Sequence, residues 1–203
     1  SWRNVNGAPL PLPPSPHPGV AGDQYGRVNY THGFFYTEIK RTAINKIRNA
    51  RSRVWLATAY FVPSIKLRRT LRQAARRGVD VRLLLPGTHT DHPAIRHVGR
   101  RFYHRLLHDG VHIFEYQPRF THSKILMCDD WVTIGSSNID RWTLRWDMEA
   151  NQEINGAVFA AEVSSMLERD FRDSEECLLE EWRNRPWQRR ALETFWGWVD
   201  IWL

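Results

Sequence analysis

The chain has 203 residues, with 29 Lys and Arg against 22 Asp and Glu, and its formal net charge at pH 7 is +7. A hydrophobic fraction of 42% excludes an intrinsically disordered chain, and no run of eighteen apolar residues is present that could form a conventional membrane-spanning helix. Cys128 and Cys177 are too few for a disulfide framework or a thiolate metal site, and they favour a reducing compartment. The positive charge favours an anionic partner, for which nucleic acid and phospholipid are equally compatible.

The first thirty residues contain six of the eleven prolines, which can neither continue a helix nor donate to a strand ladder. We therefore expect a proline-rich linker over residues 1–26. Ser1 is not a start methionine, and no signal peptide is recognisable. These features predict a fragment or a processed chain.

Apolar residues at helical spacing predict a helix over 35–50, and the apolar run 54–61 predicts a buried strand. A second helix is expected to begin after Ser64 and to end before Gly78. The strand 79–85, a third helix over 93–108 and the strand 111–116 follow. This alternation predicts an α/β fold whose sheet is largely parallel and covered by helices on both faces.

The pattern changes after Pro118, where strands follow one another without intervening helices. Strands are expected over 122–128, 131–135 and 150–155, with a turn at Asp129 and Asp130, and a helix over 160–171. The sheet is therefore expected to be mixed, extended by hairpin-like connections. Residues 27–175 are interpreted as one folded half-domain, followed by a tail over 176–203.

His122 and Lys124 stand two residues apart in the expected strand 122–128, so their side chains should project from the same face. A reaction at a phosphodiester needs this combination. The ammonium holds phosphoryl oxygens, while the imidazole attacks phosphorus or protonates the departing oxygen. A His-x-Lys pair alone is usually a surface pair, so the prediction depends on the neighbouring positions.

Four further residues accompany this pair. Ser136 and Asn138 follow the strand 131–135, where a hydroxyl and an amide can approach phosphate oxygens. Glu149 is placed to orient an imidazole through its second ring nitrogen, as carboxylates do in other histidine-based sites. Asp129 has an odd offset from His122 and lies at the expected turn, which favours a supporting role over contact with substrate.

The spacing His122-x-Lys124, four residues, Asp129, and then Gly-Ser-x-Asn six residues later, with Glu149 eleven residues after the Asn, resembles the HKD motif of the phospholipase D superfamily. The segments 55–63, 74–79 and 147–151 are similar to the C-terminal half of bacterial cardiolipin synthases. The resemblance covers about residues 25–175.

The resemblance implies a phospholipase D-like half of an α/β sandwich, in which two similar halves share a site at their interface. His122 becomes one of two active-site histidines and protonates the leaving alcohol, while the other histidine forms a phosphohistidine. The implied catalytic positions are His122, Lys124, Asp129 and Glu149. The implied phosphate ligands are Lys124, Ser136 and Asn138. No metal and no cofactor are implied.

A single motif is insufficient on chemical grounds, because one general acid contributes about 10² to 10⁴-fold and the nucleophile must be a separate group. We expect the second histidine from a missing N-terminal half or from a second copy related by a two-fold axis. The proline-rich start favours the missing half.

The tail is rich in Trp and Arg. From residue 188 to 203, helical spacing predicts an amphipathic C-terminal helix suited to the headgroup boundary of an anionic bilayer. The candidate membrane contacts are Trp187, Phe195, Trp196 and Trp202. The alternative is a helix that docks on the protein's own core or on the missing half.

A second basic cluster belongs to the helix expected after Ser64. It is predicted to be a solvated helix face, with contact to headgroups or phosphates as the alternative. The cluster consists of Arg68, Arg69, Arg72, Arg76 and Arg77.

The function predicted is phosphatidyl transfer of the cardiolipin synthase type on an anionic phospholipid, with hydrolysis where water replaces the alcohol acceptor. The resemblance implies a peripheral protein on the cytoplasmic face of a bacterial inner membrane. One alternative is a homodimeric, metal-independent phosphodiesterase or nuclease of the same superfamily. The other is a half-domain that binds lipid without activity of its own.

Overall fold

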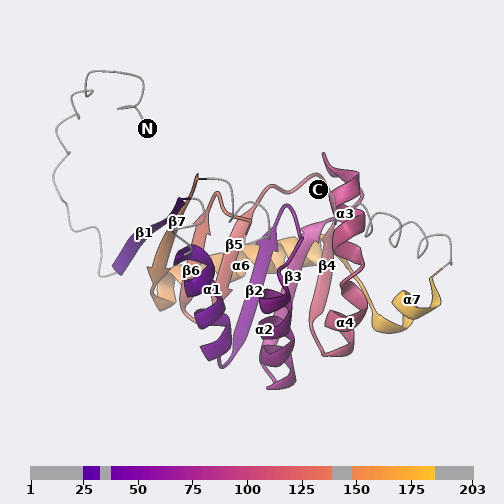
Figure 1. The fold of residues 1–203 in the computed structure, drawn as a ribbon, viewed down its shortest axis with the longest axis horizontal. Helices are drawn as coiled ribbons and strands as arrows, with labels where there is room; N and C mark the ends of the chain where they lie inside the picture. Colours follow the sequence, from indigo (N-terminus) through magenta and orange to yellow (C-terminus); the bar gives the residue numbers. More distant parts are fainter. Residues whose placement is uncertain (1–24, 33–37, 139–147, 186–203) are drawn as a thin grey trace.

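A sheet of eight strands, in the order β1-β7-β6-β5-β2-β3-β4-β8, organises the computed structural model, which describes residues 25–32, 38–138 and 148–185 (Figure 1). The strands are β1 (Tyr25–His32), β2 (Arg53–Thr58), β3 (Asp80–Pro86), β4 (His112–Tyr116), β5 (Lys124–Cys128), β6 (Trp131–Gly135), β7 (Met148–Asn155) and β8 (Ser174–Glu176). The helices are α1 (Glu38–Asn49), α2 (Ile65–Arg76), α3 (Pro93–Arg100), α4 (Tyr103–His108), α6 (Ala157–Arg172) and α7 (Leu179–Asn184). No helix in the described ranges is long and apolar enough to cross a membrane.

The mixed α/β fold is confirmed, but the sheet is not largely parallel. Among the strands of the described ranges, parallel pairing is confined to β2 with β3 and β3 with β4. The pairs β1–β7, β7–β6, β6–β5, β5–β2 and β4–β8 are antiparallel. The connections between the strands explain these directions. A crossover helix returns the chain so that the next strand runs parallel to the last, whereas the hairpin between β5 and β6 reverses the chain direction.

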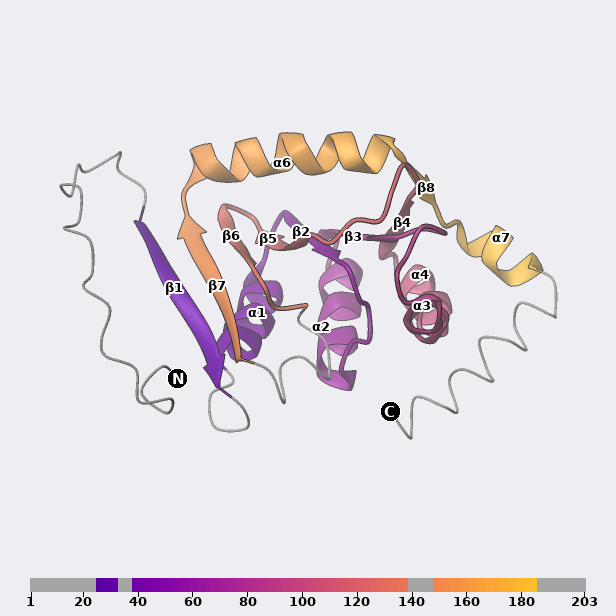
Figure 2. The same ribbon diagram turned by 90° about the horizontal axis from the view of Figure 1, so that it is seen from above.

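Helices cover both faces of the sheet, as predicted. Figure 2 shows α6 alone along one face and α1, α2, α3 and α4 along the other. Strand β2 feeds both layers: Val54 and Leu56 pack with α1 and α2, while Trp55 and Ala57 pack with Leu167 of α6. Because neighbouring strand residues point to opposite faces, one strand contributes to two hydrophobic cores.

The predicted ends of α2 are confirmed by their capping geometry. The Ser64 hydroxyl accepts a hydrogen bond of 3.2 Å from the Leu67 N–H at the start of the helix. Gly78 follows the last turn with φ of +86°, a left-handed conformation that costs glycine little. Gly110 ends the next helical region in the same conformation, also with φ of +86°.

The single helix expected over 93–108 is wrong, because the structure divides it into α3 and α4. The Phe102 N–H donates to the carbonyl three residues back, on Gly99, at 3.1 Å, and this tighter turn breaks the α-helical ladder. A Cβ on Gly99 would lie 2.7 Å from the Phe61 carbonyl oxygen, so α3 packs closely on the segment after β2.

Three elements lack a clear sequence signal. Strand β1 is an outer strand of the sheet that exposes Val28 (66%) and Tyr30 (53%) and buries the polar Asn29 between them, so its apolar residues are not its buried ones. Strand β8 has three residues and adds to the opposite edge. Helix α7 buries Trp182 against Tyr103 of α4, with ring centroids 4.9 Å apart, so this part of the expected tail docks on the protein's own core.

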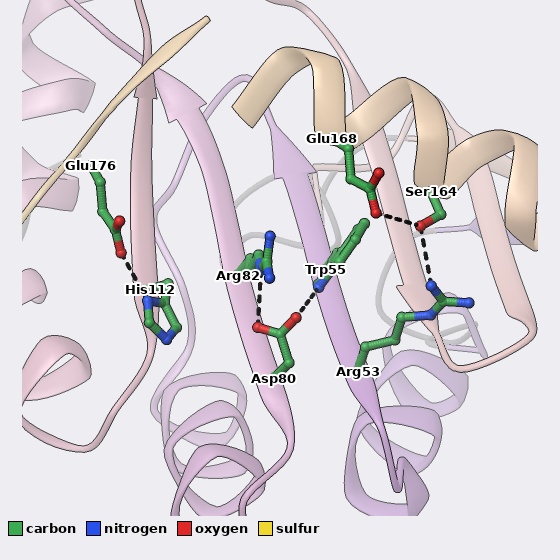
Figure 3. Close-up of polar contacts among 8 residues, drawn as sticks. All are labelled: Arg53, Trp55, Asp80, Arg82, His112, Ser164, Glu168 and Glu176. Atoms are coloured by element: carbon green, nitrogen blue, oxygen red, sulfur yellow. Dashed lines mark hydrogen bonds and ion pairs between the residues drawn. The ribbon is translucent and has the colours of Figure 1, made fainter. Parts of the chain in front are cut away.

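Polar contacts beneath α6 join its side chains to the starts of β2 and β3 (Figure 3). Arg53 donates to the Ser164 hydroxyl of α6 at 3.1 Å. The Trp55 indole N–H and the Arg82 guanidinium both donate to Asp80, at 3.0 Å each. These residues cluster at the beginnings of the two parallel strands, which leaves the opposite strand ends for the site described next.

Candidate active site

Four strand ends meet at the edge of the sheet toward which the arrow of β2 points (Figure 1). The predicted motif residues other than Asp129 lie at this edge. Thr58 ends β2 and pairs with Lys124, the first residue of β5. Gly135 ends β6 and pairs with Asn151, near the start of β7. Because β5 is antiparallel to both β2 and β6, its beginning lies beside their carboxyl ends.

His122 and Lys124 lie side by side, as predicted. The Lys124 ammonium is 3.1 Å from Nδ1 and 3.2 Å from Nε2 of the imidazole, and it donates to the His122 carbonyl at 3.0 Å. His122 is exposed, so its ring is open to a ligand. The expectation that His122 lies on a strand is wrong: β5 begins at Lys124, because its partner β2 ends at Thr58.

Two aromatic residues that the motif analysis did not assign flank His122. The rings of Tyr60 and Phe120 have centroids 5.9 and 5.6 Å from the imidazole. The Tyr60 hydroxyl donates to Asp91 at 2.6 Å. Burial and this hydrogen bond raise the pKa of Tyr60 to about 12, so the phenol stays protonated at neutral pH. Tyr60 lies two residues beyond β2, in the apolar run 54–61, and that position is the only sequence signal for it.

The loop after β6 is held by backbone and amide contacts. The Ser136 hydroxyl accepts from the Ala150 N–H at 3.1 Å and donates to the Ala150 carbonyl at 3.4 Å. The Ser137 N–H donates to Asn151 Oδ1 at 3.2 Å, and Asn151 Nδ2 donates to Thr133 at 3.1 Å. The buried Asn151 therefore fixes the path of the loop that carries Ser136 and Asn138.

Asn138 approaches Lys124 through the neighbouring strand. Its carbonyl and its Oδ1 lie 3.2 and 3.3 Å from the Thr58 hydroxyl, and they share the single proton of that hydroxyl with the Tyr60 carbonyl, 3.2 Å away. Thr58 is the register partner of Lys124. Asn138 Oδ1 faces the Thr58 hydroxyl. Among the contacts of the described residues, Asn138 Nδ2 is therefore the part of the amide left to donate to a ligand.

Glu149 is buried on β7, on the same face of the strand as Asn151 and Glu153. Glu153 is bonded to Arg27 and Asn29 at 2.8 Å each. Within the described ranges, no hydrogen bond joins the Glu149 carboxylate to His122. Glu149 thus lies near the start of β7, and its carboxylate is not hydrogen-bonded to this imidazole.

Asp129 is not brought to His122. It lies at the far end of β5, five residues from Lys124, which corresponds to about 16 Å along a strand. Its carboxylate accepts three backbone N–H bonds, from Arg51 at 2.9 Å, Ser52 at 2.9 Å and Arg53 at 3.0 Å. Burial alone would raise the pKa of Asp129, but these hydrogen bonds lower it below the usual value. The position agrees with the supporting role that its offset predicts.

The arrangement has the parts needed to hold a phosphate and to move a proton. An ammonium lies beside an accessible imidazole, and the Asn138 amide lies on the loop that follows the adjacent strand β6. Among the described residues, no group of three or more His, Cys, Asp or Glu side chains is arranged to hold a metal ion. The membrane-contact candidates Trp187, Phe195, Trp196 and Trp202, with the helix expected over 188–203, lie outside the described residues.

Comparison with known proteins supports this interpretation of the motif. The family described as cardiolipin synthase, PLD-like domain, matches residues 43–171. The chain is 32% identical over 167 residues to minor cardiolipin synthase ClsB of Bacillus subtilis, covering 80% of this chain and 42% of the relative. It is 40% identical over 123 residues to cardiolipin synthase B of Escherichia coli, covering 60% and 30%. The chain therefore spans less than half the length of these relatives.

Solved structures show the same fold at low sequence identity. The phospholipase D family member Nuc from Salmonella typhimurium superposes with a TM-score of 0.64 at 15% identity, covering 77% of this chain and 99% of that one. The phosphatidylserine synthase of Haemophilus influenzae superposes with a TM-score of 0.68 at 12% identity, covering 87% and 46%. One such unit is thus nearly a whole chain in the first structure and about half of the second.

Proposed function

The chain belongs to the cardiolipin synthase, PLD-like domain family, and we propose that it supplies one half of a phosphatidyl-transfer site in which His122 works with a second histidine. The observation that carries the proposal is the Lys124 ammonium, 3.1 and 3.2 Å from the ring nitrogens of an exposed imidazole. A fixed cation and an imidazole that can donate or accept a proton thus meet at one accessible strand end, as transfer at a phosphodiester requires.

In the proposed reaction the second histidine attacks phosphorus of an anionic phospholipid. A P–N bond forms as the bond to the leaving alcohol oxygen breaks, and protonated His122 donates its proton to that oxygen. An acceptor alcohol then attacks phosphorus, the P–N bond breaks, and His122 takes up the acceptor's proton. An alcohol on glycerol or phosphatidylglycerol gives transfer, whereas water gives hydrolysis.

The remaining motif residues have separate proposed roles. Lys124 neutralises a phosphoryl oxygen, and Asn138 Nδ2 donates to another. The Ser136 hydroxyl contributes only by giving up its 3.4 Å bond to the Ala150 carbonyl. Glu149 orients a histidine supplied by the other half. Asp129 stabilises the loop before β2 through its backbone hydrogen bonds and does not contact substrate.

The source of the second histidine is part of the proposal. The relatives are longer than this chain, which covers 42% of the Bacillus subtilis protein and 30% of the Escherichia coli protein, so their length accommodates a second half. We place the assembled enzyme at the surface of a bacterial inner membrane, on its cytoplasmic face, because its substrate is a lipid.

A second candidate is a homodimeric phosphodiesterase or nuclease that needs no metal. The structural match covers 99% of the Salmonella Nuc chain, so a single unit of this fold can be an entire chain. This similarity of fold favours the homodimeric candidate. Two copies paired about a two-fold axis would bring two His122 residues together. A half-domain that binds lipid without activity of its own is the third candidate.

The test is the turnover of phosphatidylglycerol and of a soluble phosphodiester by His122→Ala and Lys124→Ala, with Lys124→Arg retaining the charge. Loss of the general acid should lower turnover about 10² to 10⁴-fold, and loss of the cation about 10² to 10³-fold. His112→Ala is the matched control, because His112 is also exposed but contacts Glu176 at the far edge of the sheet (Figure 3).

Light scattering on the same samples distinguishes the assemblies. Activity should appear only in fractions that contain two halves, whether from a second copy or from a longer chain. A strictly monomeric chain with one motif that turns over the diester, or full activity in His122→Ala, contradicts the proposed mechanism.

A further inference from the structure

A groove lined by five arginines lies between α2 and the α3–α4 turn. It has a volume of about 510 Å³, within the range of sites that hold small ligands. Its lining consists of Ile65, Arg68, Arg69, Arg72, Arg101, Phe102, Arg105 and Leu106. None of these residues is acidic, so the groove concentrates positive charge. The sequence-based expectation of a solvated face on α2 is therefore incomplete, since α4 supplies part of the cluster.

One acidic residue pairs with a member of this cluster. Asp109, which follows α4, is paired with Arg72 and, at 2.7 Å, with Arg76. Burial raises the pKa of Asp109, but hydrogen bonds from Arg76 and Arg72 outweigh it and bring the pKa to about 2. One carboxylate thus serves two guanidinium groups, and Arg76 does not line the groove.

Arg68 lies at the centre of the mutual repulsion. Burial lowers its pKa, and the charges of Arg101, Arg105, Arg72 and Arg69 lower it further. All four are groove residues, so they lie close enough to one another for an anion to relieve their repulsion together. A negatively charged ligand bound in the groove would therefore reduce the repulsion among these arginines.

The cluster is held in place by packing. The guanidinium groups of Arg68 and Arg101 lie 4.1 and 4.6 Å from the centre of the Phe102 ring. Stacking on an aromatic face fixes the plane of a guanidinium and leaves its edge for oxygen acceptors. This geometry suits phosphate oxygens better than freely moving lysines would.

The groove also has an apolar rim on the side where α2 begins. Ile65, the first residue of α2, is 60% exposed and lines the groove. Since α2 follows the end of β2, which carries Thr58, the groove opens near the edge of the sheet that holds His122. Exposed aliphatic side chains beside arginines are typical of surfaces that contact the headgroup boundary of an anionic bilayer.

We propose that this arginine groove binds the phosphate-bearing headgroup of an anionic phospholipid at the membrane surface, as a site separate from the His122 centre. The ligand held there is not the one that reacts. Its function is to seat the folded unit on the bilayer with the His122 end of the sheet toward the lipid. The inference stands independently of the proposed reaction.

The experiment is sedimentation of the full chain with phosphatidylglycerol vesicles at about 0.1 M salt, where exposed charges are already screened beyond about 10 Å. Arg69→Gln/Arg105→Gln removes two exposed groove charges without touching the Phe102 stack. Arg48→Gln/Arg172→Gln removes two charges that are also exposed, at the ends of α1 and α6. The groove variant should bind at least tenfold more weakly, while the control and His122→Ala should stay within twofold of the parent chain.

Further measurements distinguish binding to a lipid surface from binding to other phosphate-bearing ligands. Ile65→Ser should weaken vesicle binding severalfold but leave calorimetric binding of sn-glycerol 3-phosphate unchanged. Equal losses in the two double variants would show diffuse charge and overturn the proposal. It is also overturned if Ile65→Ser leaves vesicle binding intact, or if duplex DNA binds the groove more tightly than the vesicles do. Loss of turnover in His122→Ala with retained vesicle binding supports two separate sites.

Discussion

At the scale of single residues, the site depends on side chains that reach one another from the ends of strands. Lys124 begins β5 and His122 precedes it, yet the ammonium contacts both ring nitrogens. Asp129 belongs to the same motif but faces the backbone of residues 51–53 at the opposite end of the strand. The motif therefore combines residues of the site with a residue that stabilises the fold.

Asp129→Asn should lower the free energy of unfolding by about 2 kcal/mol at pH 7, because hydrogen bonds to a charged acceptor are lost. Asp129 has φ of +53°, which asparagine also tolerates, so this variant isolates the charge from backbone strain. The native carboxylate has a lowered pKa. Its contribution is thus complete above about pH 4 and disappears as the pH falls through the native pKa.

Urea unfolding at pH 7 and at pH 3 measures this effect, with the exposed Asp130→Asn as the matched control, expected within about 0.5 kcal/mol of the parent. The difference between Asp129→Asn and the parent should be smaller at pH 3. A difference that grows on acidification would contradict the assigned role of the carboxylate.

At the scale of elements, the approach of β6 to β7 positions the loop that carries Asn138. A Cβ on Gly135 would overlap the Ala150 carbonyl and lie 2.6 Å from Asn151 Cα, so only glycine allows the two strands this separation. The break between α3 and α4 is a second element-scale feature, because it brings Arg101 and Arg105 opposite α2 and completes the groove.

Gly135→Ala should lower stability by about 1 to 3 kcal/mol, the usual cost of overpacking, and diester turnover more than tenfold, because the loop after β6 must shift. Gly110→Ala is the control. Nothing lies within 4 Å of a Cβ there, so only its φ of +86° is penalised, at about 1 to 2 kcal/mol. Thermal unfolding and turnover assays on both variants test this, and equal turnover in the two would show that the β6–β7 contact does not position the site.

At the scale of the whole molecule, one sheet separates two hydrophobic cores. Leu71 of α2 is fully buried on one face, and Leu167 of α6 is 1% exposed on the other. Strand β2 contributes side chains to both cores, so neither layer can lose its packing without disturbing the strands that serve the other. We therefore expect the layers to unfold together.

Leu71→Ala and Leu167→Ala should each cost about 2 to 5 kcal/mol, and the double variant should equal their sum within about 0.5 kcal/mol, because the two side chains share no partners. Denaturant unfolding followed by tryptophan fluorescence and by far-ultraviolet circular dichroism should give coincident transitions for every variant. Separate transitions in either single variant would show that the two layers unfold independently.

Local sequence patterns determined most of the elements of this protein and the membership of its motif. Helix periodicity, the Ser64 cap, the glycine stops and the hairpin at Asp129 and Asp130 depend on residues near one another in the chain, so they can be predicted without a fold. Strand β1 cannot be predicted in this way, because it exposes the apolar Val28 and Tyr30 and buries the polar Asn29. The direction of strand pairing cannot be predicted from local patterns, because it depends on where each strand inserts into the sheet.

Only the tertiary structure decided which of these residues meet. It brought Tyr60 and Phe120 onto His122, kept Asp129 at the other end of β5, and joined the arginines of α2 to those around α4. The physical reason is that strand register and helix packing set these distances, and both arise from contacts between segments far apart in sequence. Spacing along the chain names the residues of a motif, but packing between distant elements decides whether each one lies at the site, on the backbone of another segment or at the surface.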